Sequence, residues 1–383
     1  MKSILFLGGG PLGIPIIKWA KEIGFNVIVN DRNLQSPGLA LADVKINFDS
    51  TDIRSLTTWA TNYNDKLNIR YCYCGSDFGL LTAAVIHDVL DIPHAPLSAV
   101  INGLDKNLMK KCWSDSDSIN YPLSKIVSSE QEIVAAGKEL GWPLIIKPTS
   151  SSGSQGVSLA NNEREAALYF QEAGKYANTG HIIAEQFIEG SHHDVNGLFW
   201  DDIFYPCGIG DRFFTPFPYC VPHHGYFPSK LASLQRQELY GLLGKGARSM
   251  GINWGPVKAD GVFGNDKCYV YEISPRFHGD VFTSNVMGFL KNVNPLYQLL
   301  NWIYKGKSTV FIPIENATNV IGGWKTIFND FEKEQLTNII GLYVKDGERA
   351  KIVKNNDEIV GLAWAWEKSR EKINNLLKIG AHD

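Results

Sequence analysis

Two acidic residues on neighbouring predicted strands could together bind a divalent cation. Asp260 lies in the strand-like run 257–262, Glu272 lies in the run 267–274, and the Gly264-Asn265 pair between them predicts a hairpin turn. Two carboxylates on one face repel each other unless a proton or a cation lies between them. Hard oxygen ligands of this kind suit Mg²⁺, which also binds nucleotide phosphates. The alternative is an acid on each strand that faces solvent.

The expected pairing of the hairpin sets the distance between the two acids. If Phe263 pairs with Lys267, Asp260 lies opposite Val270. Glu272 then becomes a diagonal neighbour of Asp260 on the same face, within about 7–8 Å. We therefore expect the two carboxylates to converge.

A second segment has the composition of a phosphate-binding loop. The apolar strand-like run 143–148 delivers Lys147, and the hydroxyl-rich run 149–157, punctuated by glycine, follows it directly. Small residues let backbone N–H groups approach phosphates without obstruction. The pattern is not a Walker A motif, and its alternative is a solvent-exposed hairpin. Further along, the run 182–190 contains Glu185 and a short linker whose backbone could bind an adenine edge.

The first turn of the chain offers a competing nucleotide signal. Residues 8–13 satisfy G-x-G-x-x-G between a predicted strand and a predicted helix, and Asp31 ends the following strand. A dinucleotide-binding fold places its ribose-binding acid at about this point. The same glycines are also needed to turn a strand into a closely packed helix. A dehydrogenase is therefore the alternative from a different functional class.

The elements that carry these residues alternate between strands and helices. Such elements are expected at 4–7, 14–23, 26–30, 70–74 and 78–90. They predict an open parallel α/β layer over residues 1–95. Short β-type runs follow in 121–188, whereas 204–227 is dense in aromatic residues, Pro, Gly and His and is expected to be irregular. A helix is expected over 234–250, and the tail 311–379 mixes strands with one amphipathic helix.

Composition narrows the class of protein. The chain has 383 residues, which suggests two or three domains. Its 37 Lys and Arg residues against 40 Asp and Glu residues leave no basic surface for nucleic acid or an anionic membrane. The longest apolar runs are too short to span a membrane, and the N-terminal run is too short for a signal peptide. The six cysteines lack CxxC spacing, so a reducing, cytoplasmic location is expected.

Taken together, these segments resemble the ATP-grasp superfamily in order and spacing. The matching pieces are Lys106 in Asp105-Lys106, Lys147, the Gly153/Gly156 loop, Glu185, and Asp260 with the ending Glu272-Ile273-Ser274-Pro275-Arg276. The resemblance covers about residues 100–290. Residues 1–95 resemble the Rossmann-like N-terminal domain of the family, which generally does not bind NAD.

The resemblance implies a fold of α/β and α+β class in three parts. These are a Rossmann-like domain over 1–100, an ATP-grasp domain over 101–305 and a small α+β region over 306–383. Within the second part, a small subdomain is expected at about 121–188. The tail is similar to the C-terminal domain of amino-acid ligases and of carbamoyl-phosphate-synthase-like members.

The resemblance also implies roles for individual residues. The implied ATP-binding residues are Lys106, Lys147, Ser152, Gly153, Ser154, Gly156, Glu185, Phe187, Ile188 and His192. The implied metal ligands are Asp260, Glu272 and Ser274, and the implied catalytic residues are Lys147 and Arg276. Two of these positions depart from the family pattern, because His192 replaces a frequent ribose-binding Glu and Ser274 replaces the usual Asn.

Substrate residues are expected in the irregular segment 211–230 and just after Arg276. The candidates are Arg212, His223, His224, His278 and Gly279. The run His192-His193-Asp194 could suggest a transition-metal site. Adjacent residues on a strand point to opposite faces, however, which disfavours that interpretation.

The resemblance implies an ATP-dependent carboxylate–amine ligase that works through an acyl phosphate and uses Mg²⁺, with Mn²⁺ as an alternative. Its partners would be a small-molecule carboxylate and an amine, and a homodimer would be common for the family. Within the same fold, the alternative is an enzyme that activates bicarbonate. The two departures also leave open a nucleotide-binding regulator without catalysis.

Overall fold

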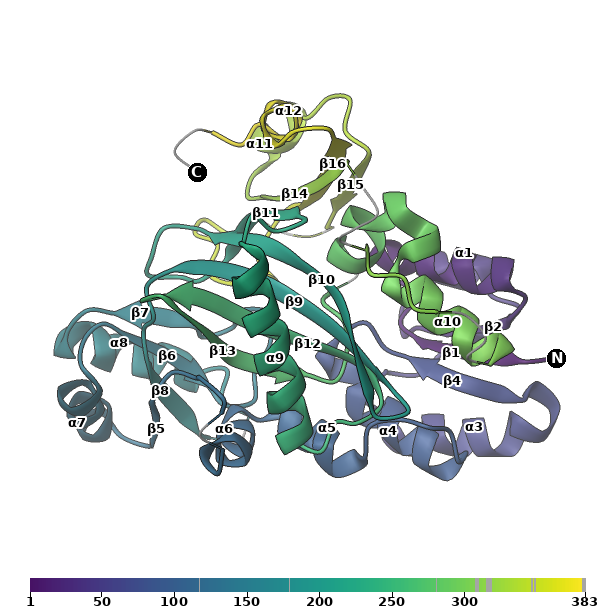
Figure 1. Ribbon diagram of the computed structural model, residues 1–383, viewed down its shortest axis with the longest axis horizontal. Coiled ribbons are helices and arrows are strands. Elements are labelled where there is room, and N and C mark those ends of the chain that lie inside the picture. Colours follow the sequence, from purple (N-terminus) through teal and green to yellow (C-terminus); the bar gives the residue numbers. More distant parts are fainter. Residues whose placement is uncertain are drawn as a thin grey trace.

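Three β-sheets organise the chain (Figure 1). The computed structural model describes residues 1–116, 118–178, 180–279, 281–306, 310–314, 319–345, 347 and 349–380. The first sheet is parallel, in the order β3-β2-β1-β4, with strands β1 (Ser3–Leu7), β2 (Asn26–Asn30), β3 (Val44–Ile46) and β4 (Ile69–Tyr73). Its helices are α1 (Ile14–Ile23), α2 (Pro37–Leu41), α3 (Ile53–Leu67) and α4 (Leu80–Val89). Residues 1–95 are called the N-terminal layer below.

Close packing explains the glycine turn after β1. A Cβ on Gly9 would lie 2.9 Å from Val29 Cγ1 and 3.3 Å from the Cα of Gly38 at the start of α2. Only glycine therefore allows this approach. The Gly9 N–H also donates to Asp31 Oδ2 at 2.8 Å. The acid that the dinucleotide alternative assigns to a ribose is bonded to the turn itself.

The second sheet is small and antiparallel, in the order β5-β8-β6-β7. Its strands are β5 (Ser124–Val127), β6 (Leu144–Pro148), β7 (Ser158–Ala160) and β8 (Ile182–Gln186). Helices α7 (Glu130–Leu140) and α8 (Glu163–Gly174) share a hydrophobic core with it. Ser129 and Asn162 cap these helices through their side chains, so each helix starts where the sequence supplies an N-cap.

The third sheet has eight strands in the order β13-β12-β9-β10-β11-β14-β16-β15. Its first five strands by sequence are β9 (Ser191–Trp200), β10 (Ile203–Phe214), β11 (Pro222–Phe227), β12 (Gly255–Gly264) and β13 (Lys267–Ser274). Helix α9 (Ser233–Ser249) packs on β9, β12 and β13 (Figure 1). Leu239 and Leu243 of α9 lie where a Cβ on Gly261 or Gly197 would point. Along a strand, successive side chains point to opposite faces of the sheet. The residues directly before and after these glycines therefore lie on the face away from α9, which is called the site face below.

Most of the segment 204–227 is regular, contrary to the expectation from its composition, and only residues 215–221 lie between strands. It forms most of β10 and all of β11, which pair with each other and with their neighbours. A Cβ on Gly210 would lie 2.4 Å from the Phe282 ring, so glycine makes room for an aromatic side chain inside a strand. Glycine and aromatic residues thus reflect dense packing here, not irregular backbone.

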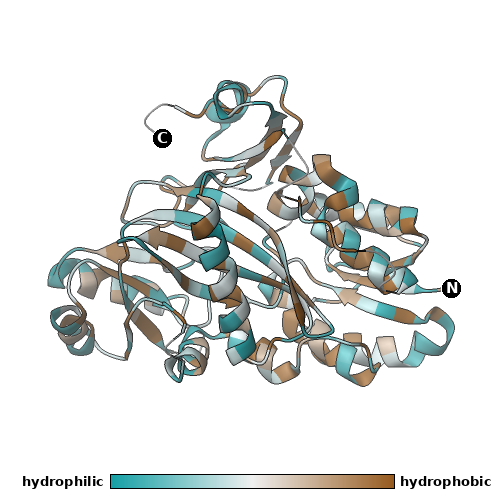
Figure 2. Cartoon of the chain, viewed as in Figure 1, coloured by the Kyte–Doolittle hydropathy of each residue, from teal (hydrophilic) through white to brown (hydrophobic). Residues whose placement is uncertain are grey.

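The C-terminal strands continue the large sheet. They are β14 (Ile321–Ile327), β15 (Gly341–Val344) and β16 (Gly361–Glu367), and β14 pairs with β11. Three further helices are α10 (Pro295–Lys305), α11 (Asp330–Glu334) and α12 (Arg370–Leu377). The helices at the edge of the molecule carry both hydrophilic and hydrophobic residues (Figure 2), as expected where one face is buried. Among the described helices, none is long and apolar enough to cross a membrane.

Candidate active site

Two lysines and one glutamate form the centre of the predicted phosphate site. Lys147 of β6 and Lys110 of α6 (Lys106–Ser114) approach Glu185 of β8, with Nζ–Oε distances of 2.6 and 2.9 Å. Glu185 is only 2% exposed. Burial alone would raise the pKa of Glu185, but the two ammonium groups lower it below its ordinary value. The carboxylate is therefore ionised and held by the two lysines, and the adenine contact expected for Glu185 stays a prediction.

The glycine-rich loop contacts Lys106. Gly153, Ser154 and Gly156 have φ angles of 64°, 61° and 69°, a left-handed conformation that helps consecutive N–H groups converge. Lys106 Nζ donates to Ser151 O at 2.8 Å and so ties the loop to α6. On its outer side, Ser154 Oγ donates to the Cys220 carbonyl at 2.8 Å.

The linker after β8 provides an aromatic and apolar surface. Phe187 packs edge-on against Phe217, and Ile188 is buried. His192 lies beside the rings of Phe214 and Tyr271, and its Nδ1 is buried without a hydrogen-bond partner among the described residues. Burial and the nearby arginine lower the pKa of His192 to about 4, so its ring is neutral near pH 7 and able to accept or donate a hydrogen bond.

The two predicted metal-binding carboxylates meet more directly than expected. Gly264 pairs with Lys267, one residue out of the predicted register, because Asn265 and Asp266 both have positive φ and form the turn. An irregularity after Asp260 shifts the pairing by one further residue and places Asp260 directly opposite Glu272. The predicted register was wrong, but the convergence of the acids is observed.

A lysine lies between the two carboxylates. Lys258 Nζ is 2.9 Å from Asp260 Oδ2 and 2.8 Å from Glu272 Oε1. Burial opposes the charge on each acid, yet Lys258 lowers the pKa of both below their ordinary values. The hard, ionised oxygens fit Mg²⁺ chemically. Because the ammonium group already bridges them, Lys258 must shift when a divalent cation binds both.

The site face of β9 adds further polar groups. Asp194 pairs with Arg212 of β10, whose Nη1 is also 3.3 Å from Asp260 Oδ1. His278 Nε2 lies 3.0 Å from the same Asp260 oxygen, and the His278 N–H donates to Asn196. Asp194, Asp260 and His278 are close enough to share a cation. Arg212 already pairs with both acids, so we assign no metal to this cluster beyond the Mg²⁺ expected at Asp260 and Glu272.

Arg276 is held by an acid from the N-terminal layer. Its Nε and Nη2 donate to the two carboxylate oxygens of Asp77 at 2.7 and 2.6 Å. Ser274 donates its hydroxyl to Asp77 Oδ1 at 3.0 Å, and its role as a metal ligand stays a prediction.

One predicted substrate residue, His224, lies off the site face. His224 stacks on Phe213, which alternates with Arg212 along β10 and so lies on the opposite face. His223 lies against His224 and Phe328. His193 also lies off the site face, and its Nδ1 is 3.0 Å from Asp211. The His192-His193-Asp194 run therefore does not converge on one metal. Gly279 begins the turn after His278, where its carbonyl accepts from the next segment.

Several site residues were missed from the sequence. Lys110 follows Lys106 by one helical turn, and Lys258 precedes Asp260 by two residues on the same strand. Both spacings place the pairs on one face and could have been used. Asp77 comes from a distant part of the chain, and no local pattern connects it with Arg276.

The nucleotide-binding segment matches a known family. Residues 105–196 match the model described as the carbamoyl-phosphate synthase L chain, ATP binding domain. The D-alanine–D-alanine ligase of Pseudomonas entomophila is 30% identical over 192 residues, which are 47% of this chain and 56% of that protein. The matches to the first curated relatives cover only 32% to 56% of the relatives' own length.

Solved structures match the chain over nearly its whole length. The L-amino acid ligase from Bacillus licheniformis has a TM-score of 0.80 at 17% identity. The match covers 98% of this chain and 96% of the ligase chain. The biotin carboxylase domain of Hydrogenobacter thermophilus 2-oxoglutarate carboxylase, a dimer with MgADP and bicarbonate, has a TM-score of 0.75 at 17% identity. This match covers 99% of this chain and 89% of the biotin carboxylase chain. The chain therefore contains a segment similar to this ATP-binding domain at residues 105–196, and it shares its overall fold with these solved enzymes.

Proposed function

We propose that the protein is an ATP-dependent ligase that joins a carboxylate to an amine through an acyl phosphate. One observation carries the proposal: Lys106 links the two halves of the site. Its Nζ donates to Ser151 of the glycine-rich loop and lies 3.6 Å from Glu272 Oε2. The phosphate loop and the carboxylate pair therefore flank one space, as phosphoryl transfer from nucleotide to substrate requires.

Each residue then has a task in binding ATP. Lys106 and Lys147 would hold the phosphates, with Glu185 and Lys110 fixing the position of Lys147. The loop residues Ser152, Gly153, Ser154 and Gly156 would close over the phosphates through their backbone N–H groups. Phe187 and Ile188 would contact the adenine and His192 the ribose. The low pKa of His192 leaves its ring uncharged for this purpose.

The chemistry needs no side-chain nucleophile. A carboxylate oxygen of the substrate attacks the γ-phosphorus, and ADP leaves. The amine then attacks the carbonyl carbon of the acyl phosphate, loses a proton to solvent, and expels phosphate, which keeps one oxygen of the original carboxylate. Mg²⁺ held by Asp260 and Glu272 would neutralise charge on the phosphates. Lys147 and Arg276 would bind the transferring group, so positioning and charge neutralisation provide the catalysis.

The domain layout follows from the same proposal. Residues 1–100 would form the Rossmann-like domain, 101–305 the ATP-grasp domain and 306–383 a C-terminal region. Because β11 pairs with β14, the large sheet contains strands from both sides of the boundary between residues 305 and 306. The boundary therefore separates two parts of the sequence but does not interrupt the sheet. A homodimer is proposed by analogy with the dimeric biotin carboxylase domain, and sedimentation would test it.

A substrate screen tests the function. Purified protein is incubated with ATP and Mg²⁺ and pooled amino acids, other carboxylates, amines or bicarbonate, and ADP and phosphate are measured. We expect release that depends on both a carboxylate and an amine, and that is lost in Asp260→Asn/Glu272→Gln. Asp49→Asn, which removes an exposed ion pair with Arg32, is the control and should retain turnover. Bicarbonate alone as the stimulating acid would indicate the carboxylase-type activity, and absence of turnover in every pool would reject the ligase.

A further inference from the structure

We propose that Asp77 is a positioning residue for Arg276. It would hold one edge of the guanidinium so that the remaining N–H groups face the transferring phosphoryl group. This inference rests on the proposed function of Arg276, and it assigns the N-terminal layer a direct part in the reaction. Neither the sequence patterns nor the resemblance to known proteins points to Asp77.

The contact between the two residues has a two-pronged geometry. Arg276 Nε and Nη2 donate to Oδ1 and Oδ2 of Asp77, and Nη1 donates to the Phe277 carbonyl at 3.0 Å. A guanidinium has five N–H groups, and these bonds use three. Two therefore remain for a phosphoryl oxygen. Both side chains are largely buried, so the pair is shielded from solvent.

Asp77 is itself held in place. It begins the short 3₁₀ turn Asp77–Gly79 that leads into α4, and Oδ1 also accepts the hydroxyl of Ser274. A Cβ on Gly79 would lie 2.7 Å from Cys74 Sγ, so this turn is closely packed. Burial would raise the pKa of Asp77, but Arg276 lowers it below its ordinary value. The acid therefore stays charged and fixed.

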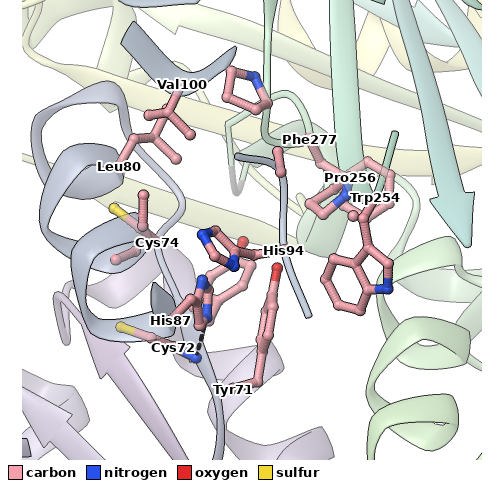
Figure 3. Close-up of a pocket in the computed structure, with 16 residues that line it drawn as sticks. Tyr71, Cys72, Cys74, Leu80, His87, His94, Val100, Trp254, Pro256 and Phe277 are labelled. Atoms are coloured by element: carbon pink, nitrogen blue, oxygen red, sulfur yellow. Dashed lines mark hydrogen bonds between the residues drawn. The ribbon is translucent and has the colours of Figure 1, made fainter. Parts of the chain in front are cut away.

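A pocket lies next to the two segments that carry Asp77 and Arg276. A cavity of about 40 Å³ adjoins the two segments (Figure 3). Cys74 and Leu80, on either side of Asp77 in sequence, line it from the N-terminal layer, and Pro275 and Phe277, which flank Arg276, line it from the other side. A space of this size could hold one or a few water molecules.

Nucleotide binding tests the inference independently of turnover. An arginine directed at the γ-phosphoryl group should make the protein prefer Mg·AMP-PNP over Mg·ADP. Titration calorimetry measures this preference as the ratio of the two dissociation constants for wild type, Asp77→Asn, Arg276→Ala and the double variant. Asp77→Asn keeps the size of the side chain but removes its charge. Asp43→Asn, which breaks the Lys21 ion pair of the N-terminal layer, is the matched control.

We expect Asp77→Asn to lower the preference for Mg·AMP-PNP to the level of Arg276→Ala. The double variant should show the same preference as Arg276→Ala alone. Asp43→Asn should behave as wild type. In turnover, kcat should fall about 10- to 100-fold with the KM for ATP within about threefold, as for other residues that orient a reacting group. If Asp77→Asn does not fold, Arg276→Lys supplies the comparison, because lysine keeps the charge but cannot make the two-pronged contact.

The outcomes separate the positioning role from the ligase function. The positioning role would be overturned if wild type showed no preference for Mg·AMP-PNP, or if Asp77→Asn left the preference unchanged. It would also be overturned if Asp77→Asn lowered the preference as much in the Arg276→Ala background as in wild type. These conclusions hold whether or not phosphate is released. A lowered preference without substrate-dependent phosphate release would support the positioning role and reject the ligase.

Discussion

Replacing Glu185 by glutamine should destabilise the protein far more than removal of an exposed acid. Glu185 is buried between Lys110 and Lys147, and both lysines are themselves buried. The substitution leaves two ammonium groups close together without their counter-ion. Breaking a buried ion pair in this way costs about 3–5 kcal/mol. We therefore expect the free energy of unfolding to fall by about 3 kcal/mol or more.

Urea titration followed by fluorescence measures this loss. Glu139→Gln is the control, because Glu139 pairs with Lys125 at the surface and such pairs contribute about 0–1 kcal/mol. Removing Lys110 as well, in Glu185→Gln/Lys110→Met, restores the net charge of the cluster and should recover part of the stability. A loss in Glu185→Gln no larger than in Glu139→Gln, or no recovery in the double variant, would refute this account of the lysine cluster.

Three further predictions concern the loop and the response to pH. Gly156→Ala should weaken Mg·ATP binding about tenfold in calorimetry. The reason is that Gly156 has φ of 69° and an added Cβ would lie 3.1 Å from the Cα of Ala173. Unchanged affinity would contradict the conformation of the loop. Asp357→Ala removes the 2.5 Å contact with Gln155 and should raise the KM for ATP about threefold without changing kcat, and an unchanged KM would show that this contact is irrelevant to ATP. Burial lowers the pKa of His87 from 6.5 to about 3, so acid favours the unfolded state from about pH 6.5 downwards. Urea titrations should show that the free energy of unfolding falls by about 2 kcal/mol between pH 7 and pH 5, and by less in His87→Gln. Equal pH dependence in both proteins would argue against a neutral, buried His87.

The sequence predicts the parts of the site that lie within single strands, helices and loops. The strand that ends at Lys147, the small-residue loop after it and the acids of the hairpin all have local signals, and the structure brings them to one space. The predicted hairpin register is wrong by one residue at the turn, which Asn265-Asp266 form, and by two residues at Asp260, because the strand pairing is irregular after Asp260. Local composition does not reveal such an irregularity.

Long-range contacts account for most of what sequence reasoning missed. Asp77 and Arg276 are separated by 199 positions, and only the docking of the N-terminal layer against the end of β13 joins them. The segment 204–227 was misjudged for a related reason. Its glycines are required by side chains such as Phe282 that pack on β10 from elsewhere in the chain, and that requirement is invisible until the fold is known.

The most direct test of the central claim follows one oxygen atom. Once a carboxylate and an amine that support turnover are identified, the carboxylate is labelled with ¹⁸O and the phosphate released is analysed by mass spectrometry. Attack of the carboxylate on the γ-phosphorus predicts one ¹⁸O atom in each phosphate molecule. Phosphate without the label would mean that water or another oxygen receives the phosphoryl group, and would contradict an acyl-phosphate mechanism at this site.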